Sequence, residues 1–254
     1  MNICFIANHN KTYFFSSIGK ELSKVNIKIF WIVFNKSNYD FLVSNYPHSN
    51  ILYLPKLKIL KNNNPQVDDF NLNELIYGDK MLRYQYDIGL QYLQNIQLPI
   101  FNFIQSNNIN YVFGECTWAH ELLINRMLRK LEELKCKFLS PHTIRIPNGR
   151  FAFFEDEYQA QIFPVTDSLS TCPYPHEEFI PKKPDYLKLN DNILAGKNSL
   201  KGRFNRFKNL FTSKNLDEND ITLPVKSSLL RIVIPLKEEV NKVLYKKLQT
   251  KDID

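Results

Sequence analysis

The chain has 254 residues, a net charge of +7 and 44% hydrophobic residues. This composition is that of a globular protein and excludes general disorder, and the length allows one large domain or two modest ones. The basic balance suits either an anionic partner or a lysine-rich solvated surface. Neither a clustered aromatic and basic motif nor zinc-finger spacing accompanies it, so we expect no nucleic-acid partner.

The four cysteines are scattered along the chain, without a C-x-x-C pair. They are typical of free thiols in a reducing cytosol rather than of a disulfide framework or a zinc site. The first residues, "MNICFIANHNK", lack the basic region and long apolar stretch of a signal peptide, and no apolar run approaches the roughly 20 residues that span a bilayer. We therefore expect a cytoplasmic protein, with peripheral contact at the inner membrane face left open.

The first quarter of the chain alternates between strand and helix patterns. Buried apolar runs at 2–8, 26–35 and 50–55 predict strands, and helical spacing predicts helices at 12–24 and 38–45. This β-α-β-α-β pattern predicts an α/β fold with a Rossmann-like, doubly wound parallel sheet. The turn after the first strand carries no G-x-G-x-x-G, so a dinucleotide site is not expected.

The middle of the chain predicts two more helix and strand pairs. Residues 56–71 are polar and irregular, and helical periodicity then extends over 73–108. Pro99 is expected to break or kink that helix, because proline lacks the N–H that helical bonding requires. A strand ending at Glu115 precedes a helix predicted over 117–135.

Thr117 is the expected N-cap of this helix, because its hydroxyl can accept a hydrogen bond from the first helical turn. A strand is predicted at 136–141, followed by a loop with short elements. We expect a helical C-terminal extension on both sides of Pro235. The predicted domains are a Rossmann-like domain at 1–165, a Pro-rich and basic connector at 166–222, and a helical segment at 223–254.

The sequence "FGECTWAHEL" places polar residues where a strand ends and a helix begins. Open α/β sheets bind ligands outside the carboxyl ends of their strands, so Glu115 could act as a general base or hold a sugar hydroxyl. His120, in the first helical turn, and His9, after the first strand, could face the same cleft. The alternatives are a capping or surface glutamate and packed or solvated histidines. "HELLI" lacks the second histidine of H-E-x-x-H, so no metal is expected.

The segment "SPHTIRIPNGRF" is the second dense polar stretch. Arg145 and Arg150 could clamp a phosphate or carboxylate through their forked donors, and His142 and Asn148 belong to the same stretch. The alternative is a structural loop whose arginines pair with the acidic residues at 155–157.

Several short motifs together resemble a known family. They are Gly114-Glu115, Ala119, Glu121-Leu122, Arg145, Pro147-Asn148 and Gly149-Arg150-Phe151. With them, the chain resembles the N-terminal half of bacterial capsule and surface-polysaccharide biosynthesis proteins with a glycosyltransferase type B architecture. The resemblance spans most of the chain.

This resemblance implies two Rossmann-like halves that face a cleft, the N-terminal half receiving the acceptor and the C-terminal half binding the donor. It implies hexosyltransferase-like transfer from a nucleotide sugar to a glycan or lipid-linked acceptor, without a bound metal or other cofactor. In inverting members, an acidic residue or histidine of the N-terminal half takes the acceptor proton. Glu115 matches the family's G-E motif and is therefore the expected base or acceptor anchor.

The resemblance also places the start of the donor-binding half where "KLQTKDID" ends the chain. We therefore expect the isolated chain to be inactive or nearly so. It could be a piece of a longer enzyme, a split protein that needs a separate donor-binding chain as partner, or a degenerate remnant. The alternative function is a noncatalytic binding or assembly module of a polysaccharide biosynthesis complex. A nucleotide-sugar hydrolase or epimerase is disfavoured, because no phosphate-cradling glycine loop is visible.

Overall fold

The computed structural model contains two compact units, Met1–Pro173 with Asp217–Leu223, and Tyr174–Leu216 with Pro224–Asp254. The structure describes residues 1–8, 11–61, 70–144, 150–164, 217–222 and 240. All of these except residue 240 belong to the first unit, so every helix and strand below is part of that unit. The predicted helical extension at 223–254 lies outside the described residues, apart from that one position.

The first unit is built on a six-stranded sheet with the order β3-β2-β1-β4-β5-β6. Neighbouring strands from β3 to β5 are parallel, and β6 pairs antiparallel with β5. The α/β class is therefore confirmed, with a mostly parallel sheet that is compatible with a Rossmann-like arrangement. The strands are β1 (Asn2–Ala7), β2 (Lys28–Val33), β3 (Ile51–Tyr53), β4 (Tyr111–Phe113), β5 (Lys137–Ile144) and β6 (Arg150–Phe154).

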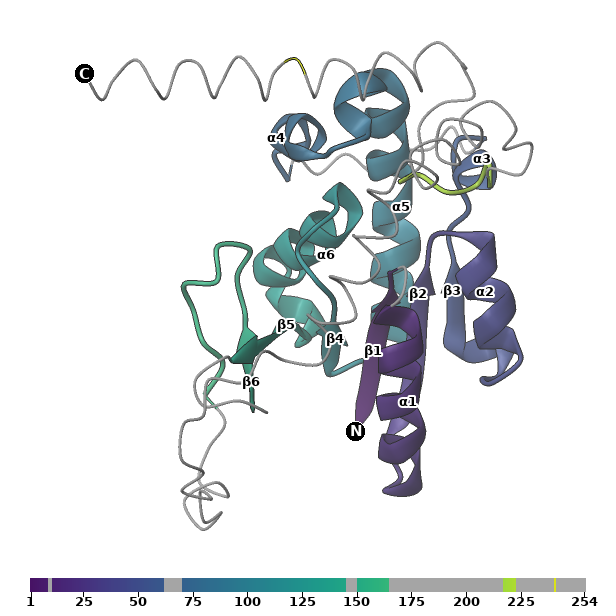
Figure 1. Ribbon diagram of the computed structural model, residues 1–254, viewed down its shortest axis with the longest axis vertical. Helices are drawn as coiled ribbons and strands as arrows, with labels where there is room; N and C mark the ends of the chain where they lie inside the picture. The colour runs from purple at the N-terminus through teal and green to yellow at the C-terminus, as the bar shows by residue number, and fades with distance from the viewer. Residues whose placement is uncertain (9–10, 62–69, 145–149, 165–216, 223–239, 241–254) are drawn as a thin grey trace, which may run out of the picture. The chain divides into compact units, whose positions relative to one another are not determined.

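Helices cover both faces of the sheet around its centre (Figure 1). The side chains of α1 and α2 pack on one face, and those of α4, α5 and α6 pack on the other. The helices are α1 (Lys11–Lys24), α2 (Lys36–Val43), α3 (Lys56–Ile59), α4 (Leu72–Gly78), α5 (Tyr86–Ser106) and α6 (Ala119–Lys130), with 3-10 turns η1 (His48–Asn50), η2 (Leu82–Tyr84) and η3 (Glu132–Leu134).

Strand β1 shows why its sequence is a continuous apolar run. Ile3 and Phe5 point into the core beneath α1 and α2, whereas Cys4 and Ile6 point into the core beneath α5 and α6. Successive side chains of a strand face opposite sides, so a strand covered on both faces must be apolar at every position. Each fully buried large aliphatic side chain stabilises the fold by about 1.5–3 kcal/mol. This burial fixes the central strands, and with them the edge that carries the candidate site.

The single helical run predicted at 73–108 is wrong, because the chain forms α4, η2 and α5 there. Asp79 ends α4, and its Oδ1 accepts hydrogen bonds from the N–H groups of Met81 and Leu82, at 2.7 and 2.9 Å. Pro99 does not break the helix: it lies inside α5, which continues to Ser106. An internal proline costs about 3 kcal/mol, and burial of the apolar face of α5 offsets this cost. That face includes Tyr92, Leu93, Ile96, Ile100 and Ile104.

Three other predictions of local structure are also corrected. A short helix, α3, lies within the stretch 56–71 that was expected to be irregular. Strand β5 continues beyond residue 141 and pairs with β6, where a loop with short elements was expected. The N-cap of α6 is Trp118 rather than Thr117, since the backbone of Trp118 is still extended and the helix begins at Ala119. The Glu121 carboxylate accepts hydrogen bonds from the N–H groups of Thr117 and Trp118.

Within the first unit, the segment 217–222 packs at the carboxyl ends of β2 and β3. The carboxylate of Asp217 accepts a 2.7 Å hydrogen bond from the N–H of Lys36, which begins α2 after β2. The N–H of Lys56, which follows β3, donates to the carbonyl of Asn219 at 2.9 Å. Ile221 is buried in the core beneath α5 and α6. This half of the sheet edge is therefore covered by the chain itself.

Candidate functional site

The strand order reverses between β1 and β4, and this reversal defines the candidate site. From β1 the chain proceeds outward to β2 and β3, and then it crosses back to β4, β5 and β6 on the other side. In open α/β sheets, ligands bind outside the carboxyl ends of the strands at such a switch point. Asn8 follows β1 at this edge, and Gly114 and Glu115 follow β4. The predicted catalytic residue therefore lies at the favoured position for a ligand.

Glu115 forms an ion pair with Lys11, the first residue of α1: the Lys11 ammonium contacts Glu115 Oε1. The lysine side chain is 53% exposed and the glutamate side chain is 18% exposed. Partial burial lowers the pKa of Lys11, and the negative charge of Glu121 acts in the opposite direction. The pair thus offers solvent both an ammonium donor and a carboxylate acceptor, the groups that bind hydroxyls and anions.

Gly114 directly follows β4 and lies between side chains of the two flanking strands, β1 and β5. A Cβ atom at this position would come within 2.8 Å of Ile6 Cδ1 and 3.0 Å of Phe138 Cζ. No other residue fits without displacing β1 or β5 side chains, because these separations are shorter than ordinary contacts. The Gly-Glu sequence therefore combines a position that needs glycine for packing with a carboxylate at the end of the strand.

Glu121 joins the ends of β1 and β4 beneath this pair. It is fully buried, and its two carboxylate oxygens accept hydrogen bonds from several donors. The side-chain amide of Asn8 donates at 3.1 Å, and the N–H groups of Thr117 and Trp118 each donate at 3.2 Å. The N–H of Glu115 donates a longer bond of 3.4 Å. One carboxylate thus holds the turn that contains Glu115 against the end of β1.

The protonation of Glu121 is set by opposing effects. Burial raises its pKa to about 7, whereas the N–H groups of Thr117 and Trp118, the Asn8 amide and the Lys11 ammonium act in the opposite direction. Glu121 therefore titrates close to neutral pH. Burial likewise raises the pKa of the neighbouring Cys116 thiol to about 12, so this thiol is protonated and a poor nucleophile at neutral pH.

A second buried carboxylate, Asp79, also binds the beginning of α6. Its Oδ2 accepts a 2.9 Å hydrogen bond from the N–H of Ala119, the first residue of the helix. Helix N-termini attract anions because their first N–H groups have no partner within the helix. At α6, Asp79 and Glu121 accept from the N–H groups of residues 117–119, so this helix end is already occupied by carboxylates of the chain.

His142 and Ser140 approach the site from β5. The hydroxyl of Ser140 and Nε2 of His142 lie 3.2 Å apart, and Ser140 is buried. Burial lowers the pKa of His142, and the Lys11 ammonium lowers it further. The imidazole is therefore neutral at neutral pH and able to accept a proton. Since Lys11 acts on both His142 and Glu115, these groups belong to one electrostatic neighbourhood.

The other predicted site residues are placed less directly. His120 is 3% exposed, and its ring packs against Phe34 with centroids 4.0 Å apart. His9, Arg145 and Asn148 lie outside the described residues. Arg150 begins β6, where its backbone pairs with Ile144. The histidine contacts and the arginine clamp proposed for a ligand therefore stay predictions.

The sequence did not identify Lys11 and Asn8 as site residues, nor Asp79 as a support for the start of α6 outside the site. Asn8 and Lys11 belong to the polar stretch "NHNK" after the first strand, in which only His9 was predicted to face a ligand. Their position beside Glu115 follows from the strand order of the folded sheet, which places β1 next to β4 and brings together the residues after both strands. Asp79 gave no comparable signal, because it lies 40 residues from the N–H that it binds.

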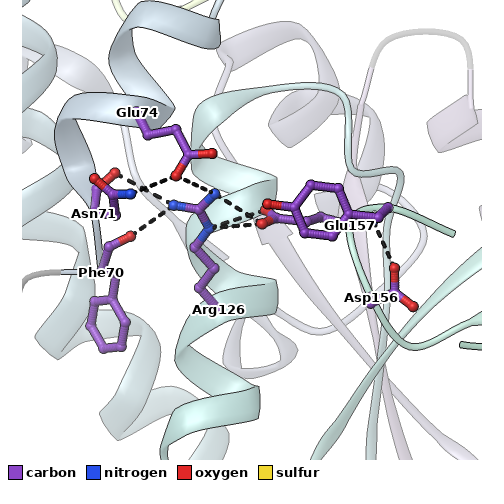
Figure 2. A network of polar contacts seen from close by, with 7 residues as sticks. Phe70, Asn71, Glu74, Arg126, Asp156 and Glu157 are labelled. Atoms are coloured by element: carbon purple, nitrogen blue, oxygen red, sulfur yellow. Dashed lines mark hydrogen bonds and ion pairs between the residues drawn. The ribbon is translucent and has the colours of Figure 1, made fainter. Parts of the chain in front are cut away.

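Arg126, on α6, lies in a different kind of charged cluster (Figure 2). Its Nε and Nη2 donate to the carboxylate of Glu157 at 2.9–3.2 Å, and Nη2 also pairs with Glu74 at 3.2 Å. Its Nη1 donates to the carbonyl of Phe70 at 3.0 Å. The guanidinium thereby links α6 to α4 and to the chain after β6. All three nitrogens have partners within the protein, which identifies this cluster as structural.

Within the described part of the chain, no group of three or more His, Cys, Asp or Glu side chains is arranged to hold a metal ion. Nor is any helix there both long and apolar enough to cross a membrane. Comparison of the chain with protein-family models, with curated proteins and with solved structures finds no match. Function must therefore be inferred from the chemistry of the site.

Proposed function

We propose that this chain is the N-terminal, acceptor-binding part of a glycosyltransferase of capsular or surface polysaccharide biosynthesis. In this proposal the first unit is a doubly wound, Rossmann-like half of a type B enzyme with hexosyltransferase-like activity. The observation that carries the proposal is the position of Glu115 at the carboxyl end of β4, where the strand order reverses, in contact with Lys11. The resemblance of the Gly114-Glu115 motif to that family supplies the reaction class.

The proposed chemistry uses Glu115 as general base or as acceptor anchor. In an inverting transfer, the acceptor oxygen bonds to the anomeric carbon of the donor as the bond from that carbon to the nucleotide phosphate breaks. The acceptor proton passes to the Glu115 carboxylate. Lys11 supports this role, because a neighbouring positive charge favours the ionised form that a base requires. His142 is a second proton acceptor in the same neighbourhood.

The partners follow from this reaction. The acceptor is a glycan or a lipid-linked glycan, and peripheral contact with the inner membrane face, where a lipid-linked acceptor would lie, belongs to the proposal. The donor is a nucleotide sugar bound by a further domain or a separate chain, and neither a metal nor another cofactor takes part.

The ion pair itself favours a second candidate, a noncatalytic binding or assembly module. Lys11 already occupies one oxygen of the Glu115 carboxylate. A group held in this way can recognise a hydroxyl-rich ligand without accepting a proton from it. In that case the cluster binds a glycan or a polysaccharide enzyme and no sugar is transferred.

Sugar transfer tests the proposal. The chain is combined with the donor-binding part, fused or as a separate chain, and incubated with labelled nucleotide sugars and capsular or lipid-linked acceptors. We expect transfer by the wild type, and a loss of about 100-fold or more in kcat for Glu115→Gln with an unchanged melting temperature. Glu132→Gln, an exposed carboxylate in η3, is the matched control and should keep full activity.

Three outcomes separate the candidates. Transfer that persists at the wild-type rate in Glu115→Gln would remove Glu115 as the base. Acceptor binding by the chain alone, lost in Glu115→Gln but never accompanied by transfer, supports the binding module instead. Absence of both transfer and acceptor binding contradicts the two functions together.

A further inference from the structure

We infer that Glu121 is a positioning residue for Glu115, which fixes the turn after β4 and ties it to the end of β1. This inference rests on the proposed function, because it assigns Glu121 a role in the reaction of Glu115. Glu121 is fully buried and does not reach solvent, whereas the Glu115 side chain is 18% exposed.

The hydrogen bonds of Glu121 reach both ends of the turn that carries Glu115. Glu121 Oε1 accepts from Asn8 at the end of β1 and from the N–H of Glu115 itself. Oε2 accepts from the N–H groups of Thr117 and Trp118, on the far side of the same turn. The backbone that carries the Glu115 carboxylate is thus held at both ends by one side chain. A displacement of about 1 Å in a reacting group can cost 100-fold in rate.

Asp79 binds the same end of helix α6 as Glu121 but accepts hydrogen bonds from different N–H groups. Its carboxylate accepts hydrogen bonds from the N–H of Ala119 and from the N–H groups of Met81 and Leu82, at the start of η2. None of these donors lies in the turn between Glu115 and Trp118. Asp79 therefore stabilises the start of α6 without holding the carboxylate of the site, and the two buried acids can be compared directly.

Charged and titratable groups around Glu121 also connect it to the site. The Lys11 ammonium of α1 faces it and also contacts Glu115. The Cys116 thiol, in the same turn, lies close enough for Glu121 to raise its pKa further after burial. A change at Glu121 is therefore transmitted to the site through two routes, the turn backbone and the shared lysine.

The test is a double-mutant cycle in the sugar-transfer assay, using the full chain with its donor-binding part. Glu121→Gln should lower kcat about 10- to 100-fold with less than about threefold change in acceptor KM, because positioning affects the reacting geometry. In the Glu115→Gln background, Glu121→Gln should have no further effect on kcat. Asp79→Asn is the matched control: it should lower the melting temperature and leave kcat unchanged. Equal losses in kcat for Asp79→Asn and Glu121→Gln would overturn the inference.

Hydrogen exchange supplies a readout that does not depend on the proposed activity. In Glu121→Gln the amides of Glu115, Thr117 and Trp118 should exchange at least tenfold faster, whereas Asp79→Asn should affect Ala119 instead. If Glu121→Gln fails to fold, Asn8→Ala removes one bond to Glu121 and should give a smaller change of the same pattern. If the wild type transfers no sugar but the variants show this exchange pattern, the proposed function is contradicted, whereas the holding of the Glu115 turn by Glu121 is supported. Unchanged amide exchange at residues 115–118 in Glu121→Gln would contradict the inference that Glu121 holds this turn.

Discussion

Two charged clusters, one around Arg126 on helix α6 and one between Lys11 of α1 and Glu115 in the turn before α6, differ in how their charges are held. Around Arg126, a planar guanidinium makes paired bonds to Glu157, and the two side chains are only 16% and 10% exposed. At the edge of the sheet, the Lys11 ammonium meets one oxygen of Glu115, and the lysine is 53% exposed. Arginine suits rigid, two-pronged contacts, whereas lysine is a hydrated point charge on a flexible chain. The comparison shows that the first contact, the Arg126 clamp, is rigid and nearly enclosed, whereas the second is half exposed and is the contact that a ligand would open in the proposed function.

The largest expected effect is at the clamp. Arg126→Ala should lower the free energy of unfolding by about 3–5 kcal/mol, because it leaves the largely enclosed Glu157 carboxylate without its partner. Arg129→Ala, an exposed arginine on the same helix, should change it by less than about 0.5 kcal/mol. Urea unfolding measures both. A small effect at Arg126 would show that the clamp and the Lys11 pair do not differ in strength.

Glu121 gives the next largest effect, as a dependence of stability on pH. Its pKa in the folded chain is raised to about 7, above the ordinary value of 4.5. Below pH 4.5 the carboxyl is protonated in both states, and between pH 4.5 and 7 only the unfolded state loses its proton. Stability should therefore fall as pH rises through this window, by up to about 3 kcal/mol.

Glu121→Gln removes this titration, so its unfolding free energy should vary less between pH 4.5 and 7 than that of the wild type. Denaturant unfolding at several pH values measures the difference. Glu74→Gln, at an exposed carboxylate of the Arg126 clamp, should retain the wild-type slope in that window. A wild-type slope that survives in Glu121→Gln would place the titrating group elsewhere.

A smaller effect is expected at Gly114, which brings β4 close to its neighbours at the site. Gly114→Ala should cost about 1–3 kcal/mol, because the added methyl group overlaps Ile6 and Phe138. Gly78→Ala is the matched control: nothing lies within 4 Å of an added Cβ there. That change should stabilise the chain by about 0.4–1 kcal/mol. Thermal unfolding of the two variants measures the difference in sign.

The sequence predicted the central strands well because their cause is local. The apolar runs around Ile6 and Ile32 identify strands that are buried on both faces. Glu115 could also be located, since a polar residue directly after a buried strand lies at the ligand-binding edge. What failed was structure that depends on distant partners. Asp79 ends α4 and binds the N-terminus of α6, so the helix break lies at Asp79, and α5 continues through Pro99.

The same distinction applies to the candidate site. Glu121 has an obvious local interpretation as an acidic residue in the first helical turn. Its bond to Asn8 crosses 113 residues, and only the sheet order reveals it. Lys11 and Glu115 meet for the same reason. The sequence pattern could therefore place single residues at the ends of strands and helices, but which of them pair with one another required the tertiary fold.

The smallest expected effect is at the Lys11 pair, and it is the sharpest test of the comparison. Lys11→Met should change the free energy of unfolding by less than about 1 kcal/mol, since a half-exposed ion pair contributes little. Removal of the ammonium should nevertheless raise the pKa of His142, because its positive charge lowers that pKa in the wild type. NMR titration of the His142 ring measures this shift, and Lys20→Met, an exposed lysine of the same helix, should leave it unchanged.

The free energy of unfolding and the pKa of His142 together show whether the Lys11–Glu115 pair acts on the site, on the fold or on neither. A small change in stability together with a raised His142 pKa means that Lys11 controls the charge of the site without holding the fold, as expected for a contact that a ligand opens. A loss of about 3 kcal/mol or more, the cost of breaking a buried pair, would instead make Lys11–Glu115 a second clamp. In that case Glu115 would not be available to a substrate, and the contrast between the two clusters would be lost.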